Sequence, residues 1–293
     1  MKSFGKKAVA TVMSTGVAAA LLSLSGNTQA ADWSDTSLGY RYGSGFAEPF
    51  GATDIAKNIF SLTHASGYKY GSNFFNADLL LSDKKDPSSP SATTGAQEIY
   101  MVYRNTLDFG KLAGKDLGWG PFAGYGITGG FDANSKDDAG YNSMKRMLVL
   151  GPTVNFKVPG FLAVSVLALW ESNAPYNKYS GVQTPRYSYD VHPMLTAAWG
   201  IPFNIGPVGL SFEGFMNFIA SKGENEFGGG TAPEFNFDGQ IMYDVGALLG
   251  SKNTFKMGFE YQYWHNKFGN SHKGPAGPGA LASTPMIRAE YHF

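Results

Sequence analysis

The chain has 293 residues, of which 43% are apolar, 15% are aromatic and only 16% are charged. In a protein surrounded by water about a quarter of the residues are charged, so this composition is unusual for a water-exposed surface. The absence of cysteine excludes disulfides, thiolate metal sites and a cysteine nucleophile. Equal numbers of basic and acidic residues, 23 of each, exclude a generally basic nucleic-acid binder.

The N-terminus has the features of a secretory signal. Three lysines and no acid precede an apolar stretch over Ala8–Leu24, and Thr28-Gln29-Ala30 supplies a cleavage site with small residues. We therefore expect residues 1–30 to be removed and residues 31–293 to form a single domain. The alternative is an N-terminal membrane anchor.

No segment of the mature chain is a credible membrane-spanning helix, which needs about 20 mainly apolar residues. Val158–Trp170 is too short, and Val191–Phe212 contains three prolines and three glycines. Apolar and polar residues instead alternate with a period of two, which is typical of strands with two different faces. The pattern predicts twelve strands: Ser37–Gly43, Asn58–Ala65, Phe74–Ser82, Gln97–Thr106, Phe122–Asp132, Met144–Phe156, Leu162–Glu171, Tyr189–Trp199, Val208–Ala220, Glu234–Val245, Thr254–His265 and Pro285–Phe293.

The connections between these strands alternate between short and long. Short links such as Pro202–Pro207 alternate with long polar links such as Asn173–Arg186, and the chain ends on an aromatic residue, Phe293. These features predict an all-β fold, a transmembrane antiparallel up-and-down β-barrel of about twelve strands, in the outer membrane of a Gram-negative bacterium. The alternative is a soluble exported β-sandwich or barrel. The apolar faces favour the membrane barrel because they carry many rings and almost no charge.

Several segments resemble the Tsx family of nucleoside-specific channel-forming proteins. The similar segments are Thr63–Leu80, Trp170–Asn177, His192–Phe203, Phe212–Gly223, Glu260–Asn270 and Arg288–Phe293. Together they extend the resemblance over essentially the whole mature chain. The resemblance implies a monomeric twelve-stranded barrel with a narrow lumen that passes nucleosides by facilitated diffusion.

The polar face of the strands defines an expected lumen. The candidate solute-binding residues on this face are Phe74, Asn76, Asp78, Glu98, Tyr100, Arg104, Glu213, Asn217, Asp238, Gln240, Glu260, Gln262, Trp264 and Arg288. The rings of Phe74, Tyr100 and Trp264 can stack on a flat base, and the amides can pair with its edges and with hydroxyls. Two alternatives remain open: the charges pair across the lumen for structural reasons only, or the barrel is plugged and acts as a surface receptor or structural envelope protein.

The sequence gives little support to an enzyme, a cofactor or a metal site. A lipid-cleaving barrel needs a serine and a histidine on the lipid-facing side, and only His64, in a strand of unclear alternation, is a candidate. The five histidines do not have a known metal-ligand spacing. We expect no enzyme activity and no cofactor. The expected partners are outer-membrane lipid, a small solute such as a nucleoside, and periplasmic chaperones and the barrel-assembly machinery during biogenesis, with no nucleic acid.

Overall fold

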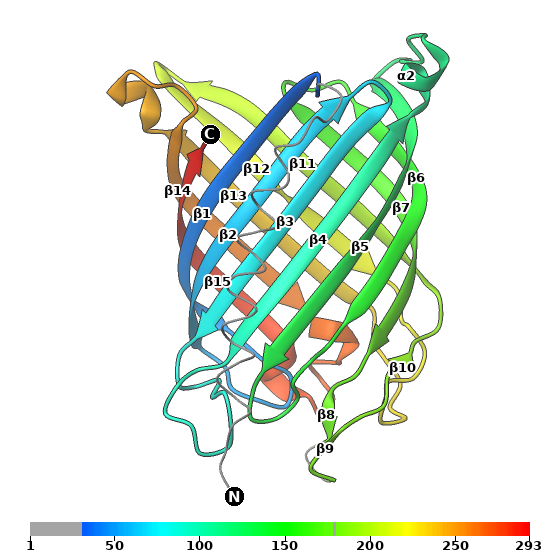
Figure 1. Ribbon diagram of the computed structural model, residues 1–293, viewed down its shortest axis with the longest axis vertical. Coiled ribbons are helices and arrows are strands. Elements are labelled where there is room, and N and C mark those ends of the chain that lie inside the picture. Colours follow the sequence, from blue (N-terminus) through cyan, green and yellow to red (C-terminus); the bar gives the residue numbers. More distant parts are fainter. Residues whose placement is uncertain (1–30, 178–179) are drawn as a thin grey trace, which may run out of the picture.

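A computed structural model describes residues 31–177 and 180–293, and the expected signal over residues 1–30 lies outside them. Twelve long antiparallel strands form one closed barrel, because the last strand, β15, pairs with the first, β1 (Figure 1). The long strands are β1 (Trp33–Phe46), β2 (Ile55–Tyr68), β3 (Gly71–Ser82), β4 (Gln97–Asp108), β5 (Phe122–Asp137), β6 (Arg146–Phe156), β7 (Phe161–Asn173), β11 (His192–Ile205), β12 (Val208–Ile219), β13 (Glu234–Asp244), β14 (Phe255–His265) and β15 (Leu281–His292).

Each of the twelve predicted strands corresponds to one long strand of the barrel, so the predicted fold class is confirmed. The largest difference lies at β11. It begins at His192, three residues later than predicted, and continues through Pro202 to Ile205. Proline lacks the amide hydrogen that strand pairing uses, so Pro202 was predicted to begin the connection Pro202–Pro207 instead of continuing the strand. Its neighbours Ile201 and Phe203 nevertheless pair with β12, and the turn is only residues 206–207.

The two ends of the barrel differ in their connections. Residues 69–70, 109–121, 157–160, 206–207 and 245–254 make the connections at what we call the short-turn end, which includes the helices α2 (Phe109–Ala113) and η1 (Gly246–Leu249). The long-loop end consists of residues 47–54, 83–96, 138–145, 174–177, 180–191, 220–233 and 266–280, with the short elements β8 (Tyr176–Asn177), β9 (Val182–Gln183), β10 (Tyr187–Ser188), η2 (Lys267–Gly269) and η3 (Gly277–Ala280). It is the lower end in Figure 1. Within the part of the chain that the structure describes, no helix is long and apolar enough to cross a membrane.

The outward face of the barrel is an apolar belt. Exposed side chains on this face include Leu38, Tyr42, Phe60, Ile99, Leu148, Trp170, Leu195, Phe218, Ile241, Phe259, Ile287 and Tyr291. On the outward face of the twelve long strands, only two residues are charged, Asp137 and Arg146, and both lie at the long-loop end. A continuous apolar surface of this kind is stable only against lipid, so the fold is that of a transmembrane barrel.

Two adjacent glycines on β5 allow a test of the close packing between neighbouring strands. A Cβ atom on Gly130 would lie 2.0 Å from the backbone oxygen of Tyr103 on β4. On Gly129 it would meet Leu150 Cδ1 at 3.5 Å and the Val149 backbone oxygen at 3.8 Å, both ordinary contacts. Gly130→Ala should therefore reduce the free energy of unfolding by about 1–3 kcal/mol, and Gly129→Ala should change it little. Urea-induced unfolding of the refolded barrel in lipid measures both, and equal stabilities would contradict this account.

Candidate functional site

The strand register places all fourteen predicted site residues on the inward face. They lie on six strands, and their outward neighbours belong to the apolar belt. The inward residues are Phe74, Asn76 and Asp78 on β3; Glu98, Tyr100 and Arg104 on β4; Glu213 and Asn217 on β12; Asp238 and Gln240 on β13; Glu260, Gln262 and Trp264 on β14; and Arg288 on β15. Their binding of a solute remains a prediction, but the structure shows which of them contact one another.

An ion-pair ladder runs along one wall of the lumen. The Arg41 guanidinium lies 2.6 Å from the Asp78 carboxylate and 3.1 Å from that of Glu260. The other Glu260 oxygen lies 2.7 Å from Arg288, which also contacts Glu290 at 2.5 Å. Each arginine therefore has two carboxylate partners, as buried charges require. The contacts connect β14, β15, β1 and β3, the strands on both sides of the closing seam.

A smaller polar group occupies the wall formed by β4 and β5. The Tyr100 hydroxyl donates to an oxygen of Asp132 at 2.9 Å, and Arg104 contacts the other oxygen of the same carboxylate. Asp132 is 4% exposed and was not among the predicted site residues. It fixes the Tyr100 hydroxyl, which is therefore already engaged with the wall.

The long-loop end of the lumen is closed by a first buried charge cluster, which we call the Glu48 cluster: Glu48, Lys57, Asp86, Lys136 and Lys267. Glu48 lies 2.8 Å from Lys57, 3.2 Å from Lys267 and 3.4 Å from Lys136. Lys136 also pairs with Asp86 at 2.9 Å. Burial alone would raise the pKa of Glu48, but the three ammonium groups lower it well below its ordinary value. Three loops and two strands are thereby held together.

A second buried cluster, the Glu171 cluster, lies on the other side of the same end. The Glu171 carboxylate lies 2.7 Å from Lys222, 3.5 Å from Lys145 and 3.7 Å from His192. Lys222 belongs to the loop 220–233, and its ammonium lies 4.3 Å from the centre of the Tyr189 ring. The loop is therefore folded inward over β7 and β11.

Glu226, in the same loop, accepts hydrogen bonds from two tyrosines. The Tyr189 hydroxyl donates at 2.5 Å, and the Tyr141 hydroxyl donates to the other carboxylate oxygen. Burial raises the pKa of Tyr141, and the Glu226 charge raises it further, so the hydroxyl stays protonated and remains a donor. Tyr189, just before β11, is therefore held at the closed end by Glu226.

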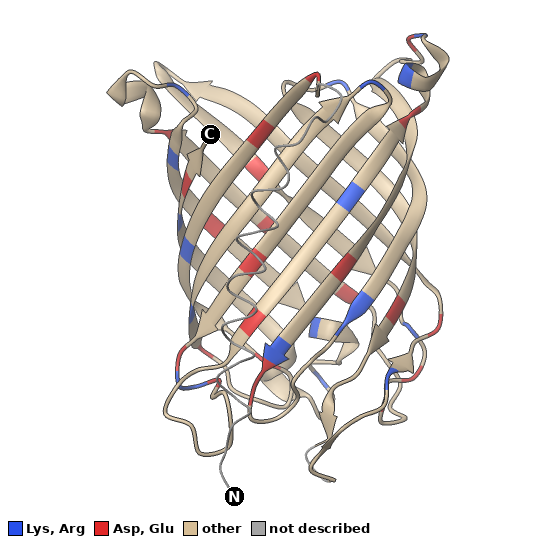
Figure 2. Cartoon of the chain, viewed as in Figure 1, with Lys and Arg blue, Asp and Glu red and all other residues tan. Residues whose placement is uncertain are grey.

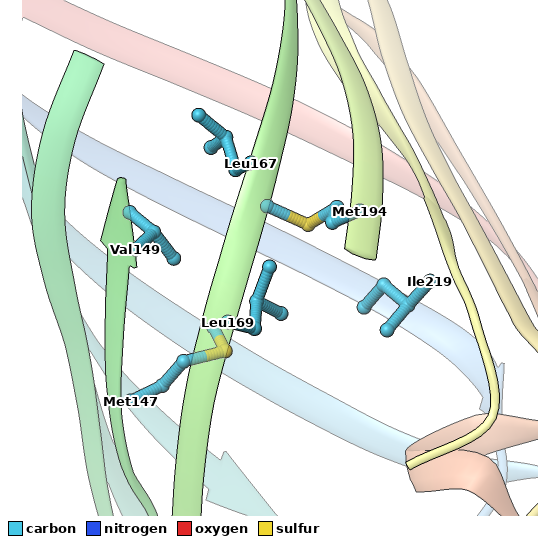
Figure 3. Packing of buried hydrophobic residues seen from close by; sticks show 6 residues of the cluster. All are labelled: Met147, Val149, Leu167, Leu169, Met194 and Ile219. Atoms are coloured by element: carbon cyan, nitrogen blue, oxygen red, sulfur yellow. The ribbon is translucent and has the colours of Figure 1, made fainter. Parts of the chain in front are cut away.

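The lumen wall is not uniformly polar, in contrast to the expectation from the sequence. An apolar cluster of inward side chains joins β6, β7, β11 and β12 (Figure 3). Its members are Met147, Val149, Leu167, Leu169, Met194 and Ile219. A second cluster joins Phe46, Ile55, Ile59 and Met286. Both faces of β6 and β7 are apolar near the first cluster, so the alternation of the sequence does not separate their inward from their outward residues and does not indicate that cluster.

Two aromatic rings in mid-strand remain exposed inside the barrel. Phe74 on β3 is 41% exposed and Phe215 on β12 is 37% exposed. β3 and β12 lie halfway round the ring of twelve strands from each other. Phe215 faces inward because it pairs with Ala198 and Asp238, both on the inward face. It was missed because it is an apolar residue between Glu213 and Asn217 on the polar face, and the other apolar residues beside it, Phe212, Met216 and Phe218, are outward.

Each exposed ring is accompanied by an asparagine two residues further along the same inward face. Asn76 accepts a hydrogen bond from Thr63 at 2.7 Å. Asn217 makes no hydrogen bond through its side chain within residues 31–177 and 180–293. We call Phe74 with Asn76, and Phe215 with Asn217, the two Phe-X-Asn pairs. Both strands run from the short-turn end to the long-loop end, so in each pair the asparagine lies on the long-loop side of the ring, on opposite walls of the barrel.

Other predicted residues are engaged in packing. The Trp264 indole donates to Glu234 at 2.6 Å, and its ring lies 5.0 Å from that of Phe268. Trp264 is thus part of the closed end, and its role as a stacking surface remains a prediction. His64 faces outward, where its Nδ1 lies 2.8 Å from the Thr36 hydroxyl. Among the described residues, no group of three or more metal-ligating side chains is arranged to hold a metal ion.

Comparisons with known proteins give distant structural matches only. No family model and no curated protein matches the sequence. The KdgM porin is 10% identical, with 88% of this chain and 99% of the porin covered and a TM-score of 0.41. The translocator domain of the autotransporter NalP from Neisseria meningitidis is 12% identical, with 98% and 96% covered and a TM-score of 0.46. The outer membrane protein OpdK from Pseudomonas aeruginosa is 9% identical, with 90% and 99% covered and a TM-score of 0.24. At these values no function can be transferred.

Removal of the Glu48 carboxylate should loosen the long-loop end. Glu48→Gln leaves three buried ammonium groups without their shared partner, and breaking a buried pair costs about 3–5 kcal/mol. Amide hydrogen exchange in residues 47–57 and 266–272 should become faster by about 10-fold or more, since 1.4 kcal/mol corresponds to a factor of ten. Asp54→Asn is the control, because it removes an exposed ion pair with Lys85 from the same loop.

The same cluster predicts a pH dependence. A carboxyl with a lowered pKa stabilises the folded state fully above its unfolded pKa, and this stabilisation is lost as the pH falls through the folded pKa. Exchange in wild-type protein, corrected for its intrinsic pH dependence, should therefore be constant down to about pH 4.5 and increase only below it. An increase that is already complete at pH 5, or equal exchange in the two variants, would contradict a central role for Glu48.

Proposed function

We propose that this protein is a monomeric channel in the outer membrane of a Gram-negative bacterium, which passes nucleosides or similar small hydrophilic solutes by facilitated diffusion. The two Phe-X-Asn pairs on opposite walls carry this proposal. Each offers a flat apolar ring beside an amide, and a nucleoside offers a flat base with hydrogen-bonding edges. Both pairs lie in segments that resemble the Tsx family, Thr63–Leu80 and Phe212–Gly223.

The charges of the lumen support a neutral solute. Arg41, Arg288 and Arg104 are all paired with carboxylates of the wall. The fields of such pairs largely cancel, so the wall is a weak filter for ions of either sign. Amides and hydroxyls near the rings remain to exchange hydrogen bonds with a polar, uncharged molecule.

The proposed location implies a route of export. Residues 1–30 would act as a secretory signal, and periplasmic chaperones and the barrel-assembly machinery would insert residues 31–293. In this orientation the short-turn end faces the periplasm and the long-loop end faces the exterior.

The closed long-loop end supports a second candidate, a barrel without transport that acts as a surface receptor or envelope component. The Glu48 and Glu171 clusters are buried and bring together loops and strands from most of the ring. Transport requires these loops to move, whereas a receptor requires them to stay in place. Conductance separates the two candidates.

The test is single-channel conductance of refolded protein in a planar bilayer, with adenosine or thymidine added. We expect saturable block by the nucleoside. Phe74→Ala and Phe215→Ala should each weaken the block, because stacking of a base on a ring is worth about 1–3 kcal/mol, or about 5- to 150-fold in affinity. Phe218→Ala, an outward ring on the same strand as Phe215, is the matched control.

The outcomes discriminate between the candidates. Conductance with block that is unchanged in Phe74→Ala and Phe215→Ala would refute the Phe-X-Asn pairs as the site. Conductance without any block would mean a pore for another class of solute. If the protein is folded but does not conduct, and Glu48→Gln does not conduct either, the receptor is the better account.

A further inference from the structure

Arg146 is exceptional among the charged residues of the barrel wall. It is the first residue of β6 and pairs with Ala133 on β5 and Ser172 on β7. Its side chain lies on the outward face, on the row next to Leu148 and Trp170 of the apolar belt. Among the outward residues of the long strands it is the only cation, and within the described parts of the chain it has no ion pair with a carboxylate.

A second arginine reaches the same place from the loop. Arg186 donates from one guanidinium nitrogen to the Ser172 hydroxyl at 3.1 Å and from the other to the Met144 carbonyl at 2.9 Å. The pKa of Arg186 is lowered, first by burial and then by the charge of Arg146. No acidic side chain of the described residues pairs with it. Two like charges held together repel each other, and an anion between them would remove this cost.

A groove with apolar side chains adjoins Arg146, which is one of its lining residues. The groove has a volume of about 550 Å³ and is lined by Phe131, Leu148 and Trp170 on the membrane side and by Ser172 and Ser188 at the rim. Asp132 and Glu171 also line it, but both face inward and are paired with cations there, Arg104 and Lys222. Phe131, Leu148 and Trp170 are neighbours across three adjacent strands. The site thus combines a cationic rim with an apolar floor, in the position where headgroups meet acyl chains.

We propose that this rim binds a phosphate-bearing lipid of the leaflet at the long-loop end, with the phosphate on the two guanidinium groups and an acyl chain in the groove. Arginine is suited to this role because its planar group gives two parallel hydrogen bonds to phosphate. A free phosphate would use only the rim, whereas the apolar floor favours a lipid. In the orientation proposed above, this leaflet is the outer one, so the lipid is a phosphorylated glycolipid of the lipopolysaccharide type.

The experiment measures retention of diphosphoryl lipid A by the full mature protein in detergent, using native mass spectrometry. Arg146→Gln/Arg186→Gln is compared with Lys157→Gln/Lys252→Gln, which removes the same charge from exposed positions at the short-turn end. We expect wild-type and control protein to retain the lipid, and the arginine variant to bind it about 10-fold or more weakly. Dephosphorylated lipid A should bind wild-type protein as weakly as lipid A binds the arginine variant.

Three results would overturn the proposal: equal retention by both double variants, equal retention of the dephosphorylated lipid, or displacement of the lipid by millimolar inorganic phosphate. The third would identify a site for free phosphate. The arginines lie outside the lumen, so nucleoside block should be the same in the arginine variant as in wild type. The lipid site and the proposed channel can therefore fail independently.

Discussion

Closure of the sheet is the constraint on which the rest of the structure depends. In lipid, a strand edge would leave unpaired amide and carbonyl groups at a cost of several kcal/mol each. The pairing of β1 with β15 removes both edges. Once the sheet is closed, each strand has one face toward lipid and one toward the lumen. Alternate residues along each strand therefore face the lipid and the lumen in turn. Because the inside is enclosed, every charge placed there needs a partner or water.

The pairing of charges accounts for the form of the lumen. The Arg41 and Arg288 ladder lies at the closing seam, where it connects the first strands to the last. At the long-loop end, loops provide the partners instead: Lys267 and Glu48 are 219 residues apart in the sequence but 3.2 Å apart in space. Charged residues are therefore found along the strands as well as in the loops (Figure 2). The clusters close one end of the lumen, while the Phe-X-Asn pairs remain accessible inside the barrel.

The sequence could predict the strands and their faces because both depend on local alternation. It could not predict the closed end, which depends on contacts between loops far apart in the chain. Glu48 and Lys222 sit in polar loops and look like solvated charges, whereas folding buries them. The inward position of Phe215 was missed for a different reason, since it is an apolar residue between Glu213 and Asn217 on the otherwise polar face of β12. Asp132 was missed because it stands at the end of the predicted strand, although the strand continues to Asp137.

The position of each charged residue follows from the dielectric environment on its side of the wall. A lumenal cation such as Arg41 on β1 obtains its carboxylates from β3 and β14, each two strands away, because a buried charge needs a partner supplied by the protein. An outward cation at mid-belt would have no such partner, and the outward face of the long strands contains none there. At the rim the environment changes within a few ångströms from acyl chains to headgroups that carry charge. An unpaired arginine is stable in this layer if the membrane itself supplies the anion, and Arg146 occupies that layer together with Arg186. The same physical rule thus explains why charges inside the barrel are paired by protein and why the two arginines outside it are not.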